Sequence, residues 1–287
     1  MGTTMTSIGI IQKTTNLSMM QPINLLSGII CATWSFVFFI ICQHLIRPLT
    51  EICHPHNNSD NIEKRKMKMV QNSPYIRTWF TDANAERWMR KNTLISFFHA
   101  FITGILGFYS CWIYSPDIHR DYVNHITWFT YLTCSFSFGY FCYDTIDIIS
   151  NQRGSELWEL MVHHALTITF FGTSIIRRMN IGYLMLALIV EINSVFLHLR
   201  KLLHQYNIPR ENLIVRLTMM INIITFLIFR FGLLIYGSMA IFRDGERAGS
   251  YFHIFLSYIL VPTVWIINIV LFYRLLYTDF LKKRKTK

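Results

Sequence analysis

Residues 251–277 read YFHIFLSYILVPTVWIINIVLFYRLLY and contain one charged side chain, that of Arg274. An α-helix rises about 1.5 Å per residue, so about 20 apolar residues cross the roughly 30 Å hydrocarbon core of a bilayer. This stretch is both long enough and apolar enough to do so. It predicts a transmembrane helix, and much of the remaining chain repeats the pattern.

Six further segments have this character, at about 22–46, 93–114, 125–149, 157–176, 181–199 and 213–241. The segments 157–176 and 181–199 are short and close together, so a total of six spans is an alternative to seven. Of the 287 residues, 52% are hydrophobic and 15% are charged, against roughly 25% charged in soluble domains. The expected fold is an all-α integral membrane protein with about seven transmembrane helices.

One long polar connection divides the chain unevenly. It separates a lone first span from a block of six spans joined by short loops. The expected parts are a lumenal or extracellular tail with the first helix at 1–49, a cytosolic linker at 50–91, a six-helix domain at 92–277 and a basic cytosolic tail at 278–287.

The distribution of positive charge predicts the orientation, because Lys and Arg are enriched in cytosolic loops. With seven spans, 20 of the 27 Lys and Arg residues lie on the side of the linker and the C-terminus, and 6 lie on the side of the N-terminus. The C-terminus is therefore expected in the cytosol. Basic tracts at 64–68 and 282–287 would attract an anionic cytosolic leaflet. The positive charge lies in loops that flank the membrane, so the net charge of +11 does not indicate nucleic acid as a partner.

Ionisable side chains within the spans are the candidate functional groups, because they are costly in hydrocarbon. Counted from the expected cytosolic ends of four helices, five of them lie about 7 to 12 Å deep: His99, Asp144, His163, His164 and Glu191. They predict one polar layer. His163 is preferred to His164 as its centre, because His164 shares its helical stripe with apolar residues. Arg230 is expected in the opposite half of the membrane, in a structural role.

An imidazole beside a carboxylate is the basic unit of general acid–base chemistry. Paired with Glu191 or Asp144, His163 would deprotonate a hydroxyl or amine that attacks a thioester, or would itself carry an acyl group. The catalytic set of an enzyme would be His163, His164 and Glu191, with acyl-CoA as co-substrate and no other cofactor. A metal is not expected, because adjacent histidines point in different directions on a helix. No broken helices or repeats are evident, which disfavours a transporter.

Several motifs together resemble the TLC domain shared by the TRAM, Lag1 and CLN8 proteins. They are FFH at 97–99, GYFCYDTID at 139–147, VHH at 162–164, VEIN at 190–193 and FR at 229–230, with Trp88 and Gly104. They occur in order over about 75–280, and within the family the sequence is most similar to TLC domain-containing proteins 1 and 2. The candidate lipid-binding residues are His99, Asp144, Asp147, Asn193 and Ser194.

In the ceramide synthases of this superfamily, a His-His pair and two acidic residues three positions apart form the acyltransferase site. The resemblance assigns His163, His164 and Glu191 to that pattern, but Ser194 occupies the second acidic position and argues against ceramide synthesis.

The subfamily most similar to this chain is associated with membrane phospholipid composition and fluidity. It limits the incorporation of long-chain polyunsaturated acyl chains. The resemblance implies that role here, at the plasma membrane or alternatively the endoplasmic reticulum, with a phospholipid or fatty acyl chain as partner. An acyl-CoA-dependent lipid acyltransferase and a TRAM-like translocation helper are the alternatives.

Overall fold

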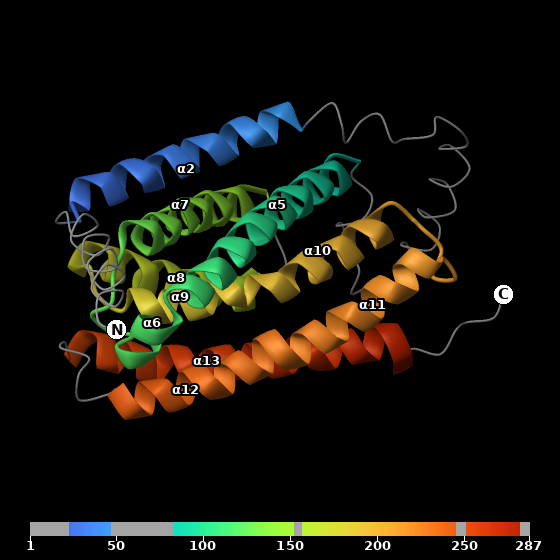
Figure 1. The fold of residues 1–287 in the computed structure, drawn as a ribbon. Helices are drawn as coiled ribbons and strands as arrows, with labels where there is room; N and C mark the ends of the chain where they lie inside the picture. The colour runs from blue at the N-terminus through green and yellow to red at the C-terminus, as the bar shows by residue number, and fades with distance from the viewer. Residues whose placement is uncertain (1–22, 47–82, 152–156, 245–250, 282–287) are drawn as a thin grey trace, which may run out of the picture.

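The computed structural model describes residues 23–46, 83–151, 157–244 and 251–281, and within these ranges it contains helices and no strand (Figure 1). The basic tracts at 64–68 and 282–287 lie outside the described residues. The helices are α2 (Leu25–Leu45), α5 (Ala83–Ile113), α6 (Ser115–Arg120), α7 (Trp128–Asn151), α8 (Leu157–Arg177), α9 (Ile181–Ile189), α10 (Glu191–Gln205), α11 (Leu213–Thr225), η1 (Phe226–Gly232), α12 (Leu233–Asp244), α13 (Tyr251–Leu276) and η3 (Tyr277–Leu281).

Long apolar helices dominate the described part of the chain. Five stretches are long and apolar enough to cross a bilayer: Leu25–Leu45, Glu86–Ile113, Ile181–Gln205, Leu213–Asp244 and Tyr251–Asp279. The helices α7 and α8 run alongside them and carry more polar side chains.

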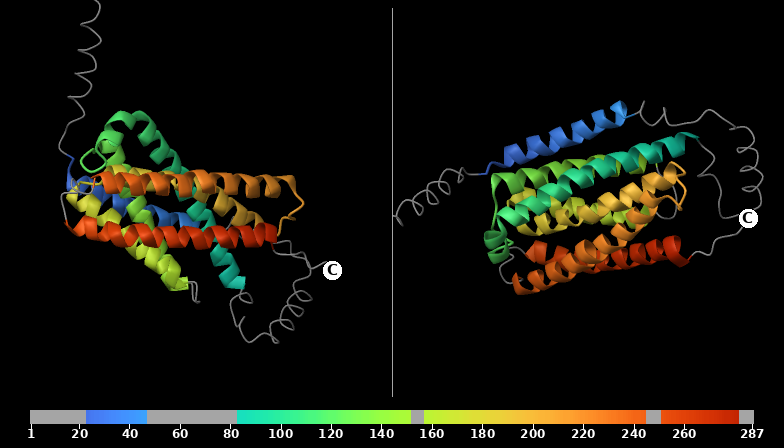
Figure 2. Two further views of the ribbon diagram at one scale, coloured as in Figure 1. Left: turned by 90° about the horizontal axis from the view of Figure 1, so that it is seen from below. Right: turned by 45° about the vertical axis from the view of Figure 1, so that its right-hand side comes forward.

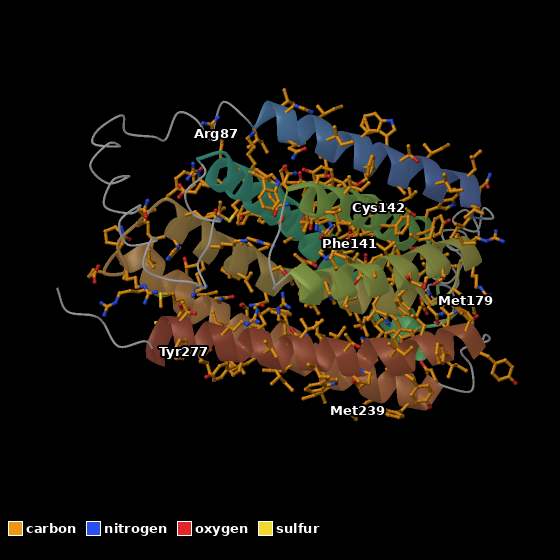
Figure 3. All side chains as sticks on the ribbon, turned by 180° about the vertical axis from the view of Figure 1, so that it is seen from behind. Arg87, Phe141, Cys142, Met179, Met239 and Tyr277 are labelled. Atoms are coloured by element: carbon orange, nitrogen blue, oxygen red, sulfur yellow. The ribbon has the colours of Figure 1, made fainter. Side chains whose placement is uncertain are left out.

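The outer surface of the bundle is apolar. Trp34, Trp112 and Met239 are 72%, 73% and 65% exposed, and Figure 3 labels Met239 on the outer side of α12. Large apolar side chains that face outward along whole helices are stable in hydrocarbon rather than in water. The chain is therefore a multi-pass membrane protein of the all-α class.

Six helical rods surround a common interior. Two of the rods consist of consecutive elements, α9–α10 and α11–η1–α12. Going around the interior, the six rods are α7, α5, α9–α10, α11–η1–α12, α13 and α8 (Figures 1 and 2). The helix α2 lies outside this arrangement and packs mainly on α7. The polar interior of the six rods and the lone outer helix agree with the expected fold.

The helix α2 approaches α7 closely because two glycines lie at the contact. A Cβ atom on Gly139 would overlap the backbone oxygen of Ala32, and one on Gly28 would overlap the ring of Tyr131. The Ser35 hydroxyl, next to this contact, donates a 2.6 Å hydrogen bond to the backbone oxygen of Phe136. Small side chains that let helix backbones approach are a common basis of helix packing in membranes.

Two helix boundaries differ from those expected from hydropathy. The helix α5 begins at Ala83, within the segment expected as linker, and α10 continues to Gln205, beyond the span expected to end at 199. Hydropathy marks only the part of a helix that lies in hydrocarbon, and both extensions are polar. A helix therefore continues past the end that its apolar run predicts.

Two spans expected as continuous helices are interrupted. Between α9 and α10, the N–H of Val190 bonds to the oxygen of Ala187 at 3.2 Å, a three-residue spacing that tightens the turn. The rod from Leu213 to Asp244 contains the π-helical segment η1. Both spans nevertheless remain single helical rods, Ile181–Gln205 and Leu213–Asp244, so the expectation of unbroken spans, which had disfavoured a transporter, is not overturned. Such local irregularities are frequent at functional sites.

Candidate functional site

The break before α10 places Glu191 at the first turn of a helix that faces α11 and η1. Ser194 lies three residues later, one turn further along the same helix. Its hydroxyl accepts a 2.9 Å hydrogen bond from Nη2 of Arg230. Ser194 therefore connects α10 to the basic side chain of η1, one turn from Glu191.

Arg230 is held by neutral partners from two further positions. Its Nε donates to Oδ1 of Asn193 at 2.6 Å, and its Nη1 donates to Oδ1 of Asn268 on α13 at 3.0 Å. The guanidinium carbon lies 5.3 Å from the centre of the Phe226 ring, a cation–π distance. The π-helical turn of η1 carries Arg230 and widens the helix at that point, so this side chain reaches α10 and α13 together.

The prediction that Arg230 lies at a different depth from the acidic groups is wrong. It assumed that the helix of Glu191 ends at 199, whereas α10 ends at Gln205. At about 1.5 Å per residue, Glu191 then lies roughly 21 Å from the end of α10, and Arg230 lies roughly 25 Å from the start of α11 at Leu213. The two residues are at similar depth, and their charges interact.

His164 forms the histidine–carboxylate contact that had been expected of His163. Its Nε2 lies 3.1 Å from Oδ2 of Asp144, and its Nδ1 lies 2.9 Å from the backbone oxygen of Leu160. A carbonyl oxygen only accepts, so Nδ1 carries a hydrogen. A further proton must then lie between Nε2 and the carboxylate. The preference for His163 failed because the stripe of α8 that carries His164 packs on α7, and α7 supplies Asp144 there.

Asp144 and Asp147 are further anchored by uncharged donors. Asn92 of α5 donates to Oδ1 of Asp144 at 2.8 Å. The two oxygens of Asp147 accept from Gln43 of α2 at 2.6 Å, Trp88 at 2.9 Å, Asn151 at 3.1 Å and Asn92 at 3.2 Å. Because its oxygens are already occupied by donors from three helices, Asp147 holds α2, α5 and α7 together.

His99 and Asn193 are likewise engaged in helix contacts. Nε2 of His99 lies 3.0 Å from the Ser137 hydroxyl, and its ring stacks on Tyr140 with centres 3.6 Å apart, between α5 and α7. The amide nitrogen of Asn193 donates to the backbone oxygen of Asn222 and to Thr225, each at 3.0 Å. Both side chains are buried. The depth count grouped His99 with the other residues of the expected layer, but its hydrogen bond joins two helices.

Six residues therefore remain as one group, which we call the interior polar cluster: Asp144, His163, His164, Glu191, Ser194 and Arg230. His163 and Glu191 are half-buried, and His163 lies within electrostatic range of Arg230. Among the described residues, none forms a hydrogen bond with the His163 ring, whose nearest aromatic neighbour is His164 with ring centres 5.7 Å apart. The cluster thus contains side chains that are hydrogen bonded to one another, namely His164 with Asp144 and Arg230 with Ser194. It also contains one imidazole, that of His163, which is free to bind another molecule.

A comparison with known protein families identifies the domain that carries this cluster. The TRAM_LAG1_CLN8 family, the TLC domain, matches residues 90–277, which contain the whole interior polar cluster. The chain belongs to the TLC domain family. It is 35% identical over 207 residues to TLC domain-containing protein 2 of Danio rerio, covering 71% of this chain and 82% of the relative. It is 32% identical over 193 residues to TLC domain-containing protein 1 of Gallus gallus, covering 67% and 75%.

Family membership makes this TLC domain chain a membrane lipid-related protein. Its interior polar cluster offers a proton held between His164 and Asp144, a free imidazole on His163, and a cation on Arg230. Within the described ranges, no three His, Cys, Asp or Glu side chains are arranged to hold a metal ion. These residues can transfer a proton and can hydrogen bond to a polar or anionic group.

Asn92 and Asn268 are hydrogen-bond partners of the interior polar cluster that the sequence analysis missed. Each bonds to a charged residue of the interior polar cluster. Hydropathy and charge patterns do not single out an uncharged amide. A lone asparagine in the middle of an otherwise apolar span, as at 268, is the signal that could have identified one of them.

Proposed function

We propose that the TLC domain of this chain binds an acyl lipid with the polar head at the interior polar cluster, and thereby limits the incorporation of long-chain polyunsaturated acyl chains into membrane phospholipids. The observation that carries the proposal is the free imidazole of His163 between the His164–Asp144 pair and Arg230. A half-buried polar ring that has no hydrogen-bond partner within a membrane domain is unfavourable unless something else binds it.

The head group that fits this environment is an oxygen acceptor. A guanidinium has five N–H donors, and three of those of Arg230 are used by Asn193, Asn268 and Ser194. The remaining donors and the His163 ring match an ester carbonyl, a carboxylate or a phosphate oxygen. The acyl chain of such a lipid would extend along the apolar helices of the bundle.

Lipid profiling of cells tests this role. Cells that lack the protein would receive the wild type, His163→Ala or His204→Ala, and His204 is an exposed histidine in the last turn of α10. We expect the wild type and His204→Ala to lower the polyunsaturated content of phospholipids, and His163→Ala to fail at equal abundance in the membrane. Full rescue by His163→Ala would contradict the proposal and is the result that a translocation helper predicts.

The His164–Asp144 pair favours acyl transfer as a second candidate function. His163, the free imidazole beside this protonated pair, would accept the proton of a hydroxyl or amine as that atom attacks the thioester carbonyl of acyl-CoA. The new C–O or C–N bond forms, the C–S bond breaks, and the departing thiolate takes up the proton. Purified protein with labelled acyl-CoA and lipid acceptors should then give labelled product, and Asp144→Asn should abolish it. The absence of turnover with hydroxyl and amine acceptors alike would exclude this candidate.

A further inference from the structure

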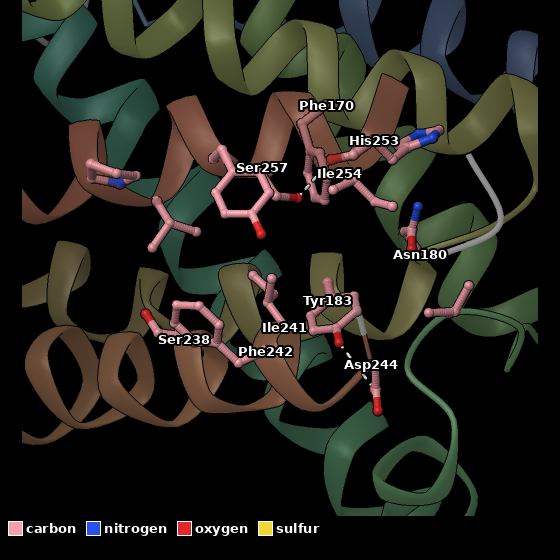
Figure 4. A pocket seen from close by; sticks show the side chains of 14 residues that line it. Phe170, Asn180, Tyr183, Ser238, Ile241, Phe242, Asp244, His253, Ile254 and Ser257 are labelled. Carbon is pink, nitrogen blue, oxygen red and sulfur yellow. Dashed lines mark hydrogen bonds between the residues drawn. The ribbon is translucent and has the colours of Figure 1, made fainter. Parts of the chain in front are cut away.

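A pocket of about 160 Å³ lies at the end of the bundle where α8 ends and α9 begins, between α9, α12 and α13 (Figure 4). It is separate from the interior polar cluster. On α13, His253 of the pocket and Asn268 of the Arg230 network are fifteen residues apart, which is about 22 Å along a helix. The pocket therefore needs its own explanation.

Two buried polar side chains in the pocket wall have atoms without a partner among the described residues. They are both ring nitrogens of His253, which is 2% exposed, and Nδ2 of Asn180, which is 3% exposed. Figure 4 shows both side chains at the pocket. Buried polar atoms are normally hydrogen bonded, so the unpaired donors and acceptors of these two wall residues favour the binding of a polar group at this pocket.

Asn180 is held in place by its backbone and not by its side chain. Its N–H donates to the oxygen of Val123 at 2.6 Å, and its φ of 63° lies in the left-handed region. It precedes the first turn of α9, where an asparagine side chain commonly bonds to the helix N–H groups, but here no such bond forms. The amide group is therefore left available to the pocket.

The unpaired groups are neutral, and the charge in the wall is already balanced. Asp244 is the carboxylate of the lining, and it accepts from the Tyr183 hydroxyl at 3.0 Å and from Nε of Arg243 at 2.9 Å. A neutral imidazole offers one donor and one acceptor, and the asparagine amide adds a donor. A hydroxyl, which both donates and accepts, matches this set better than a phosphate or a carboxylate.

The shape of the pocket points to a lipid. The wall is mainly apolar, and Phe242 of α12 and Tyr258 of α13 are 79% and 68% exposed at its edge. A volume of this size is similar to a cavity that holds about one benzene ring. The pocket can therefore enclose a small head and the first few carbons of a chain, while the rest of that chain lies in the hydrocarbon beside α12 and α13.

We propose that this pocket binds the hydroxyl head of a neutral lipid, of the class of monoacylglycerols and long-chain alcohols. His253 and Asn180 hydrogen bond to the hydroxyl, and the chain leaves past Phe242 and Tyr258. The site uses no residue of the interior polar cluster and does not depend on the function proposed above.

Photocrosslinking tests the site. The full chain in lipid nanodiscs would be labelled with a monoacylglycerol that carries a diazirine in its chain, and the labelled peptides would be identified by mass spectrometry. We expect labels on the peptides of Phe242 and Tyr258, competed by unlabelled monoacylglycerol. His253→Phe and Asn180→Leu should each weaken that competition about tenfold, the effect of one lost hydrogen bond. His204→Phe, the matched change at the opposite end of the bundle, should have no effect.

Two further probes separate head-group recognition from adsorption to any apolar surface. A diazirine fatty acid and a diazirine alkane of the same length should not label these peptides in a competable way. Unchanged competition in His253→Phe and Asn180→Leu, or equal labelling by the alkane, would overturn the proposal. If either variant does not fold, Val261→Trp fills the pocket from α13 without altering its polar atoms. Labelling of Val261→Trp at the wild-type level would also overturn the proposal.

Discussion

At the scale of single residues, Ser194 carries much of the connection between α10 and η1. In the ceramide synthase pattern this position is acidic, and an acid here would pair directly with Arg230. The serine instead accepts a hydrogen bond from Arg230 at 2.9 Å. The cation is thus left with fewer opposing charges and is better able to attract a negatively charged or polar head group.

We expect Ser194→Ala to destabilise the protein by about 1–3 kcal/mol, because it leaves an N–H of Arg230 without an acceptor inside the bundle. Ser110→Ala is the matched control. Ser110 is also fully buried, but its hydroxyl bonds only to the oxygen of Leu106 in its own helix, so its loss should cost less than about 1 kcal/mol. Unfolding of both variants in the same detergent, followed by temperature and denaturant, measures the difference. Equal losses would show that the Ser194 bridge contributes nothing.

At the scale of helices, the position of α2 depends on one close contact. We expect Gly139→Ala to destabilise the α2–α7 packing by about 1–3 kcal/mol, because the added methyl overlaps the backbone oxygen of Ala32, which cannot rotate away. At Gly237 of α12 nothing lies within 4 Å of an added Cβ, so Gly237→Ala should stabilise its helix by about 0.5–1 kcal/mol. Thermal unfolding in nanodiscs compares the two, and the same sign of change in both would contradict the packing argument.

The sequence predicts helices better than it predicts which helix faces meet. Apolar runs located α2 and α13 closely, because a span in hydrocarbon must be apolar over its length. They did not locate the polar start of α5 or the tight turn at Val190. Mean hydropathy is taken over many residues, so it does not detect a polar helix end or a turn at one residue.

Depth alone also could not predict the partner of each polar residue. The sequence analysis expected a histidine–carboxylate pair centred on His163, whereas the contact of His164 with Asp144 depends on which stripe of α8 packs on α7. The pocket at His253 had no sequence signal, since its polar residues come from separate loops and helices.

At the scale of the whole molecule, the charge bias and the helix arrangement together predict a topology. The short helix α6 and the end of α10 lie at opposite ends of the bundle (Figure 1). With 20 Lys and Arg residues on one side and 6 on the other, the end of α10 should face the cytosol. Arg120 and His204 are exposed at these two ends and can be replaced without disturbing the interior.

We expect opposite accessibility of Arg120→Cys and His204→Cys after synthesis into sealed microsomes, whose outer surface is the cytosolic face. A membrane-impermeant maleimide should label His204→Cys directly and Arg120→Cys only after detergent is added. The unsubstituted chain, whose cysteines lie mainly in helices, gives the background. If both variants were labelled before detergent is added, the two ends of the bundle would lie on the same side of the membrane. That result would contradict a topology in which α7, α8 and the five more apolar spans all cross the bilayer. The reverse pattern would retain the crossings but invert the orientation, and it would then place the end of α10 and the loop that follows it on the lumenal side.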